Sequence, residues 1–280
     1  MTTLTPMARL RASLSAPTHP AVIVGAHNPV TAALLEAADF DGAWISSLEM
    51  SLVHGLEDRN LLGIHEVAES IHYIRAASRL PLVVDADNGY GSVHSTRRAV
   101  REFEAAGASA VCLEDSTFPK ENSFIDGSAD LLDVTEHQRR ISAAKEAQKD
   151  PDFLVIARTE ALIRGYGIAE AVSRGAAYAE AGADLVLLHS RVPRGVEALQ
   201  AAAAWQGGVP LVTVPTAFPE LPPSELHAAG FSLVIYANQL LRSSVRAMQE
   251  TLDKLRNAQS VEEDCVPMQD LLKLAEGFPG

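Results

Sequence analysis

The strongest constraint on the fold is a pattern that recurs four times, in which a helix-like segment ends in small residues and a short apolar run follows. A glycine after a helix adopts the left-handed turn that ends it, and such apolar runs are typical of strands buried on both faces. The spacing between copies is roughly one or two multiples of 35–50 residues, the size of one strand–helix unit. The copies are EAADFDGAWIS (Glu36–Ser46), EAAGASAVCLE (Glu104–Glu114), EAGADLVLLHS (Glu180–Ser190) and HAAGFSLVIYA (His227–Ala237).

Four more apolar runs lie between these copies, and helical patterns such as Arg97–Ala106 and Ile168–Ala181 separate them. Eight strands alternating with helices predict an α/β fold of the (β/α)8 barrel type, and 280 residues suit a single barrel. An open doubly wound sheet is the alternative, but GAHNP follows the first run where a glycine-rich nucleotide loop would be expected. The additional runs are Ala21–Val24, Pro81–Asp85, Phe153–Ala157 and Pro210–Val214.

The C-terminal tail differs from the rest of the chain. We expect a barrel catalytic domain over residues 1–258 and a tail over residues 259–280, in which MQDLLKLAEGF forms a short amphipathic helix. The tail adds no strand, so it is expected to pack on the outside of the barrel or on a neighbouring subunit.

Composition excludes several classes of protein. A net charge of −13 repels phosphate backbones, so nucleic acid is not an expected partner. No run of about 18 apolar residues predicts a membrane span, and the N-terminal segment lacks the apolar core of a signal peptide. Cys112 and Cys265 lie far apart and form neither a disulfide framework nor a zinc pattern. We therefore expect a cytoplasmic protein without a membrane partner.

Acidic residues end two of the predicted strands. Asp85 and Asp87 follow one strand, and Glu114 ends the next. The carboxyl ends of barrel strands meet at one rim, where three converging carboxylates would repel one another unless a cation lies among them. Oxygen ligands favour Mg²⁺, although helix capping or surface ion pairs would also explain an isolated Asp-x-Asp. Asp58, in the loop after the second strand, could orient metal-bound water, act on substrate or cap a helix.

Anion-binding groups end other strands. Arg158 offers a forked donor that matches phosphate or carboxylate, and His189 ends the sixth strand, although a single histidine is often structural. Trp44 precedes the hydroxyl and backbone groups of Ser46, Ser47 and Leu48, which could hold a carboxylate.

A long polar segment, DSTFPKENSFIDGSAD, follows Glu114. At about 16 residues it exceeds the usual loop of such barrels, and long loops at this rim are often lids. Lys120 and Asn122 on such a lid could close over an anionic substrate, whereas a solvated loop with an incidental lysine is the alternative.

Four segments together resemble the isocitrate lyase/phosphoenolpyruvate mutase superfamily, and within it the phosphoenolpyruvate phosphonomutases. The resemblance covers about Val22 to Met248. The segments are DADNGYG at 85–91, the ED-x-x-FPK-x-NS pattern at 114–123, ARTEALIRGYGIAEAVSRGAAYAEAGAD at 157–184 and LLHS at 187–190.

The resemblance implies interconversion of phosphoenolpyruvate and phosphonopyruvate in a modified barrel whose terminal helices swap between subunits, usually in a dimer of dimers. It implies Mg²⁺ bound directly by Asp85, with Asp58, Asp87 and Glu114 acting mostly through water. Lys120 would help close the lid. The residues expected to contact substrate are Trp44, Ser46, Ser47, Leu48, Asn122, Ser123, Arg158 and His189.

The same resemblance separates related activities. Lyases of the superfamily use a cysteine in a KKCGH segment, where this chain has DSTFPKENS. Phosphonopyruvate hydrolases carry threonine at the position of Asn122, which favours a mutase here, and carboxyphosphonoenolpyruvate mutases remain an alternative. Ser116 replaces a lysine that is usual in mutases, and Ser47 replaces a frequent glycine. A metal-binding barrel without turnover is the alternative from a different class.

Overall fold

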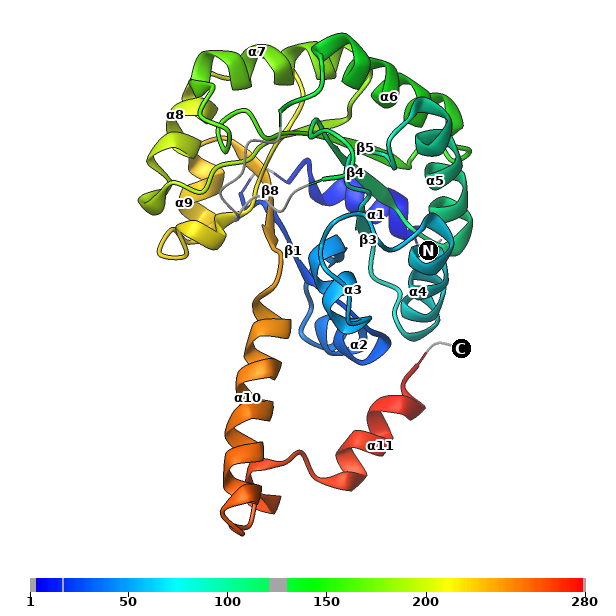
Figure 1. The fold of residues 1–280 in the computed structure, drawn as a ribbon, viewed down its shortest axis with the longest axis vertical. Helices are drawn as coiled ribbons and strands as arrows, with labels where there is room; N and C mark the ends of the chain where they lie inside the picture. The colour runs from blue at the N-terminus through cyan, green and yellow to red at the C-terminus, as the bar shows by residue number, and fades with distance from the viewer. Residues whose placement is uncertain (1–3, 17, 121–129, 279–280) are drawn as a thin grey trace.

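The computed structural model describes residues 4–16, 18–120 and 130–278. Eight parallel strands follow one another around a closed barrel, in which β8 pairs with β1 (Figure 1). The predicted (β/α)8 architecture is therefore confirmed. The strands are β1 (Ala21–Gly25), β2 (Gly42–Ile45), β3 (Leu82–Asp85), β4 (Ala110–Glu114), β5 (Leu154–Thr159), β6 (Leu185–Leu188), β7 (Leu211–Thr213) and β8 (Phe231–Tyr236).

Several helices begin where the sequence supplies a capping side chain or a proline. Asn28 caps the helix that begins at Pro29, and Ser92 caps the helix that begins at Val93. Gly107 ends the latter with a φ of 107°, which suits glycine. The helices are α1 (Pro6–Ser13), α2 (Pro29–Ala37), α3 (Ser47–Val53), α4 (Ile64–Ala77), α5 (Val93–Ala106), α6 (Val134–Ala147), α7 (Gly167–Glu180), α8 (Val196–Ala204), α9 (Pro223–Ala228), α10 (Gln239–Arg256) and α11 (Met268–Glu276).

The described residues also form three short 3₁₀ turns: η1 (Pro193–Gly195), η2 (Pro215–Ala217) and η3 (Glu262–Asp264). The predicted strand bounds differ from the structure by one or two residues. The predicted strand at 210–214 is one residue shorter at each end in the structure. The proline at 210 has no amide hydrogen to donate to a neighbouring strand, and Pro215 starts a 3₁₀ turn directly after Val214.

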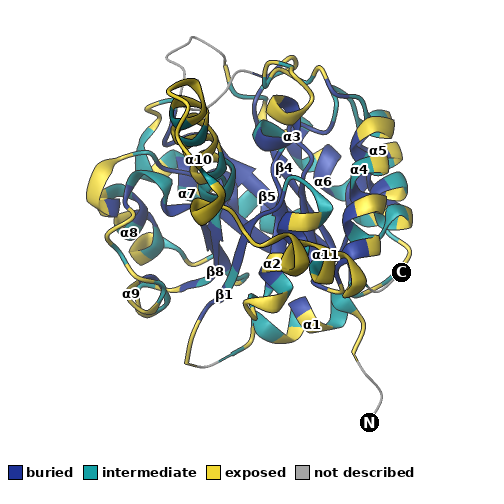
Figure 2. Ribbon diagram, turned by 90° about the horizontal axis from the view of Figure 1, so that it is seen from below, coloured by how far each residue is buried: buried dark blue, intermediate teal, exposed yellow. Residues whose placement is uncertain are grey.

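The core consists of layers inside and outside the strands. Alternate strand residues such as Ile23, Val83 and Ile156 fill the barrel interior, and Leu10 of α1 is buried in the same cluster. Other strand residues pack outward against the helices, as Val84 and Val155 do. Figure 2 shows the strands as the most buried part of the molecule. The filled interior leaves the carboxyl ends of the strands as the place for a site.

Helices α10 and α11 project from the barrel (Figures 1 and 2). Neither contains a buried residue, although Met248, Leu252 and Leu272 lie among their exposed apolar side chains. The predicted tail helix is present as α11, and α10 forms a projecting arm with it, so we call residues 239–276 the C-terminal arm. No helix in the described part of the chain is long and apolar enough to cross a membrane.

Candidate active site

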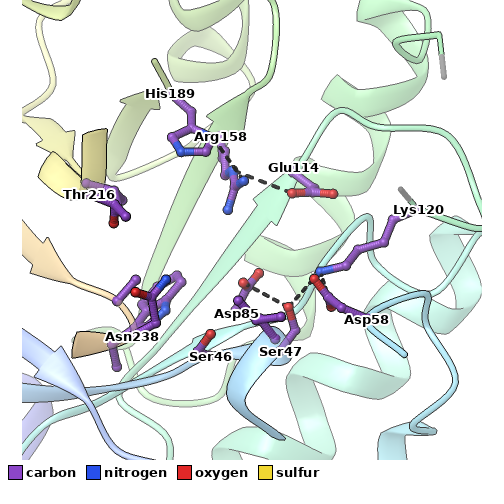
Figure 3. Close-up of a pocket in the computed structure, with 14 residues that line it drawn as sticks. Ser46, Ser47, Asp58, Asp85, Glu114, Lys120, Arg158, His189, Thr216 and Asn238 are labelled. Carbon is purple, nitrogen blue, oxygen red and sulfur yellow. Dashed lines mark hydrogen bonds and ion pairs between the residues drawn. The ribbon is translucent and has the colours of Figure 1, made fainter. Parts of the chain in front are cut away.

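An open cavity of about 550 Å³ lies at the carboxyl ends of the strands (Figure 3). It brings together residues from seven of the eight strand–helix units, and the first and last of these residues are almost 200 positions apart in the sequence. Its lining consists of Trp44, Ser46, Ser47, Leu48, Asp58, Asp85, Glu114, Lys120, Arg158, His189, Val214, Thr216, Ala237 and Asn238.

Most of the residues predicted from the sequence lie in this lining. Asp87 is the exception among the described residues, because it lines a smaller cavity behind Ser47 and Asp85. The predicted site residues Asn122 and Ser123 lie outside the described residues.

Short structural elements fix the first wall. Strand β2 ends at Ile45, and the hydroxyl of Ser46 accepts a hydrogen bond from the Glu49 amide at 3.4 Å to cap α3. The chain therefore turns sharply after β2, and Ser46, Ser47 and Leu48 lie against the cavity. Asp85 is the last residue of β3 and accepts a hydrogen bond from the Ser47 hydroxyl at 3.0 Å. This bond joins the ends of the β2 and β3 units.

A buried lysine holds the acidic side of the site together. The Lys120 ammonium lies 2.8 Å from Asp58 Oδ1 and 2.5 Å from Asp87 Oδ1, and it donates to the Ser47 hydroxyl at 2.7 Å. The Lys120 side chain is only 6% exposed. Burial alone would lower the pKa of Lys120, but Asp87, Asp85 and Asp58 hold it well above its usual value. Lys120 therefore serves as a fixed cation among carboxylates in this structure.

Arg158 occupies the opposite side of the acidic cluster, on β5. Its Nε donates to Glu160 Oε1 at 2.5 Å and lies 3.4 Å from Glu114 Oε2. His189 Nδ1 lies 2.7 Å from the same Glu160 oxygen and donates to it when that nitrogen carries the proton. Burial opposes the charge on Glu160, yet Arg158 and His189 hold its pKa well below the usual value. Glu160 is thus a carboxylate that orients both anion-binding groups.

Two carboxyl groups carry raised pKa values. Burial raises the pKa of Glu114 to about 8, although Arg158 and Lys120 oppose the shift. Burial likewise raises the pKa of Asp87 to about 6 against the opposing charge of Lys120. Ser116, which stands where mutases usually have lysine, donates a hydrogen bond to Glu114 Oε1. Burial therefore makes ionisation of these two carboxyl groups unfavourable even with Lys120 and Arg158 nearby.

These shifts predict how stability depends on pH. Asp87 and Glu114 bind protons more tightly in the folded chain than in the unfolded one, where their pKa values are 3.8 and 4.5. Unfolding then releases protons from these two groups, so their contribution to the stability of the metal-free protein should fall as pH rises from about 4 to about 8. Replacing Glu114 with glutamine should remove the part of this loss of stability that occurs toward pH 8. At pH 8 the variant should therefore have lost at least about 1 kcal/mol less unfolding free energy than wild type.

Urea denaturation of wild type and Glu114→Gln at several pH values, without divalent cations, measures the difference. Parallel stability–pH curves for the two proteins would contradict the raised pKa of Glu114. Arg98→Met, which removes an exposed surface ion pair with Glu102, is the control and should follow the wild-type curve.

The donor set fits a hard divalent cation. The candidate ligands Asp58, Asp85, Asp87 and Glu114 offer oxygen atoms only, and a bound cation would offset the burial that raises the pKa values of Asp87 and Glu114. No three His, Cys, Asp or Glu side chains in the described ranges are arranged to chelate one ion directly. Mg²⁺ commonly uses one or two direct carboxylates and keeps several waters, so this spacing suits it.

Four residues of the site were not predicted from the sequence. Glu160 stands two positions after Arg158, a spacing that places side chains on the same face of a strand. Thr216 and Asn238 follow β7 and β8, and Figure 3 shows them across the cavity from Asp58 and Lys120. Asn60 donates to Asp87 Oδ2 at 2.8 Å and accepts from the Lys120 amide at 2.7 Å. Applying the strand-end rule to all eight strands would have found Thr216 and Asn238.

Comparison with known proteins agrees with this geometry. Residues 10–256 match the profile of the phosphoenolpyruvate phosphomutase family. A phosphonopyruvate hydrolase from Variovorax sp. (strain Pal2) is 43% identical over 242 residues, which cover 86% of this chain and 83% of the relative.

Solved structures extend the similarity to three dimensions. Phosphoenolpyruvate phosphomutase from Streptomyces platensis subsp. rosaceus superimposes with a TM-score of 0.93 at 42% identity, covering 96% of this chain and 95% of the other. A phosphonopyruvate hydrolase in complex with oxalate and Mg²⁺ gives a TM-score of 0.91 at 38% identity, with coverages of 98% and 95%. Both activities are thus found among proteins that resemble this chain closely.

Proposed function

The chain belongs to the phosphoenolpyruvate phosphomutase family, and we propose that it is a Mg²⁺-dependent phosphoenolpyruvate phosphonomutase. Such an enzyme interconverts phosphoenolpyruvate and phosphonopyruvate and so forms the phosphorus–carbon bond needed for phosphonate biosynthesis. The observation that carries the proposal is the cavity that places Asp85 and Glu114 beside Arg158 and His189. An acidic metal-binding side and a cationic phosphoryl-binding side are what this reaction requires.

In the proposed mechanism, different walls of the cavity bind different parts of the substrate. In this proposal the segment 46–48 holds the pyruvyl carboxylate and the enolate with hydroxyl and backbone donors, and Trp44 closes the wall beside it. Mg²⁺, bound directly by Asp85 and through water by the other carboxylates, would supply positive charge to the enolate oxygen. Lys120 keeps Asp58 and Asp87 in place through ion pairs at 2.8 and 2.5 Å.

The side of the cavity that carries Arg158 and His189 stabilises the phosphoryl group during its transfer. Arg158 and His189, both oriented by Glu160, donate to the phosphoryl oxygens as the group passes from oxygen to carbon. The ion pair with Lys120 supports an orienting role for Asp58 over a nucleophilic one, because the ammonium stabilises the carboxylate where it lies. We assign phosphoryl contacts to Asn122 and Ser123 as well, and exclusion of water to the segment that carries them.

The second candidate is phosphonopyruvate hydrolase. The 43% identity to the Variovorax enzyme favours it, and so does Ser116, whose hydroxyl takes the place of a lysine usual in mutases. Asn122 favours the mutase, since the hydrolases carry threonine there. Lyase chemistry has little support, because Cys112 is buried in the barrel interior and Cys265 is exposed beside the C-terminal arm's last helix.

Phosphorus NMR of the protein with Mg²⁺ and phosphonopyruvate distinguishes these activities. A phosphoenolpyruvate resonance identifies a mutase, and inorganic phosphate identifies a hydrolase. An unchanged spectrum would contradict both and favour the non-catalytic barrel. Carboxyphosphonoenolpyruvate as a second substrate separates the remaining alternative within the superfamily.

We also propose that the C-terminal arm docks on a second copy of the chain, within a dimer of dimers. The arm exposes apolar side chains such as Leu252, which is 61% exposed, and Leu272, which is 59% exposed. The barrel exposes Leu34 and Leu52 on α2 and α3. Exposed apolar surface on both parts is unfavourable in an isolated chain, and exchange of arms between subunits would cover it.

Replacing Leu252 with glutamate should therefore dissociate the assembly. A buried charge at an apolar interface costs several kcal/mol, so the variant should elute as a smaller species. Light scattering coupled to size-exclusion chromatography measures the mass. Glu250→Gln, at an exposed position two residues earlier, is the control and should keep the wild-type mass. A wild-type protein that is already monomeric would contradict the proposal.

A further inference from the structure

A carboxyl group that the proposed mechanism does not use is buried directly behind the first wall of the cavity. Glu49 follows Leu48 in α3, yet it does not line the cavity and is 0% exposed. Within the described ranges, neither of its carboxyl oxygens has a hydrogen-bond partner. A buried carboxyl without hydrogen bonds is costly, so its presence calls for a physical explanation.

The only ionisable side chain that forms an ion-pair contact with Glu49 in the described part of the chain is a histidine. His27 Nδ1 lies 3.8 Å from Glu49 Oε1, and the His27 side chain is 9% exposed. His27 stands in the loop between β1 and α2. The neighbouring Ala26 amide donates to the Trp44 carbonyl oxygen at 2.9 Å. The Glu49–His27 pair therefore links the end of β1 to the segment that follows β2.

The other Glu49 oxygen reaches the seam where β1 and β8 close the barrel. A Cβ atom built on Gly25 would lie 2.6 Å from Glu49 Oε2 and 2.5 Å from the Ala237 carbonyl oxygen. The carboxyl group thus occupies the space that a side chain at Gly25 would need, and it lies beside Ala237. Glu49 and the Ala237 carbonyl therefore both pack against the backbone of Gly25 at the end of β1.

These contacts connect two walls of one cavity from behind. Ser46, Ser47 and Leu48 form one wall, and Ala237 with Asn238 forms part of another. We propose that Glu49 and His27 are positioning residues that set the spacing between these walls, and so tune binding of the oxyacid part of the substrate. The identification of the ligand as an oxyacid rests on the proposed function, whereas the contact of Glu49 with both walls does not depend on it.

The test compares three substitutions in a Trp205→Phe background, which leaves Trp44 as the only tryptophan. Trp44 is 2% exposed and lines the cavity, so its emission reports whether the wall stays closed to water. Glu49→Ala should shift this emission to longer wavelength and weaken oxalate binding, measured by calorimetry with Mg²⁺, by about tenfold or more. His27→Ala should do the same.

Glu49→Gln should rescue both properties, because the amide has nearly the same size and shape as the carboxyl group and fills the same space beside Gly25 and His27. Its oxalate affinity should stay within about threefold of wild type. The double variant Glu49→Ala/His27→Ala should bind oxalate no more weakly than the single alanine variant with the lower affinity, because the two residues act as one unit. Ser51→Ala, the control, removes a buried hydroxyl from the same helix and should change neither the Trp44 emission nor the oxalate affinity.

An alanine variant with unchanged emission and affinity would overturn the proposal, and so would a glutamine variant as damaged as the alanine variant. Failure of the proposed function is distinguishable from this outcome. If wild type leaves phosphonopyruvate unchanged and Glu49→Ala still shifts the Trp44 emission, the positioning role stands and the assigned reaction falls.

Discussion

A variant with methionine in place of Arg158 should consume phosphonopyruvate at least about a thousandfold more slowly than wild type. Methionine keeps much of the length of the side chain but removes the guanidinium, which lies between Glu114 and Glu160 in the structure. The substitution therefore removes the cation that would face the phosphoryl group and leaves two buried carboxyl groups without it. Steady-state kinetics on protein shown to be folded by circular dichroism measures the loss.

Two further variants make this result specific. Arg158→Lys keeps the charge but not the fork, so it should recover only part of the lost rate. Arg98→Met removes an arginine from the surface of α5 and should keep the wild-type rate. A rate for Arg158→Met within tenfold of wild type would show that this guanidinium does not stabilise the moving group.

Replacing Asp85 with alanine should abolish both turnover and Mg²⁺ binding. Asp85 ends β3 and faces the cavity beside Ser47, and it is the carboxylate to which we assign direct contact with the ion. Losing the direct ligand should slow the reaction by at least about a thousandfold, because the enolate loses its main source of positive charge. Calorimetric titration of Mg²⁺ in the presence of oxalate reports the binding separately from the chemistry.

Asp41→Asn is the matched control for this experiment. The Asp41 carboxylate accepts a hydrogen bond from the Val22 amide at 2.8 Å, just before β2 and therefore at the end of the barrel opposite the cavity. Its replacement should lower stability slightly and leave Mg²⁺ binding unchanged. If Asp85→Ala retains wild-type affinity for Mg²⁺, the ion lies elsewhere.

The barrel could be predicted because each strand is a short apolar run of consecutive residues, which can be recognised without knowing the rest of the fold. The same locality explains why Asp85, Glu114, Arg158 and His189 were placed together, since strand ends in such a barrel share one rim. No distance between elements was needed for that inference. It needed only the order of strands and helices.

The remaining features of the site depend on distances that the sequence does not contain. The sequence gives no indication that Lys120 contacts Asp58 and Asp87, because three separate loops must first fold against one another. The bonds of Asn60 to Asp87 and to the Lys120 amide depend on the same approach. Glu160 is different, because its position two residues after Arg158, at the end of the same predicted strand, was visible in the sequence.

The chemistry of the cavity is divided along the chain. The four carboxylates proposed to bind the metal come from the loops and strands up to β4, whereas Arg158, His189, Thr216 and Asn238 come from β5 onwards. Changes in the later half can therefore alter which anion is held without touching the carboxylates. With the proposed site divided in this way, substrate choice can diverge while the proposed metal-binding carboxylates stay the same.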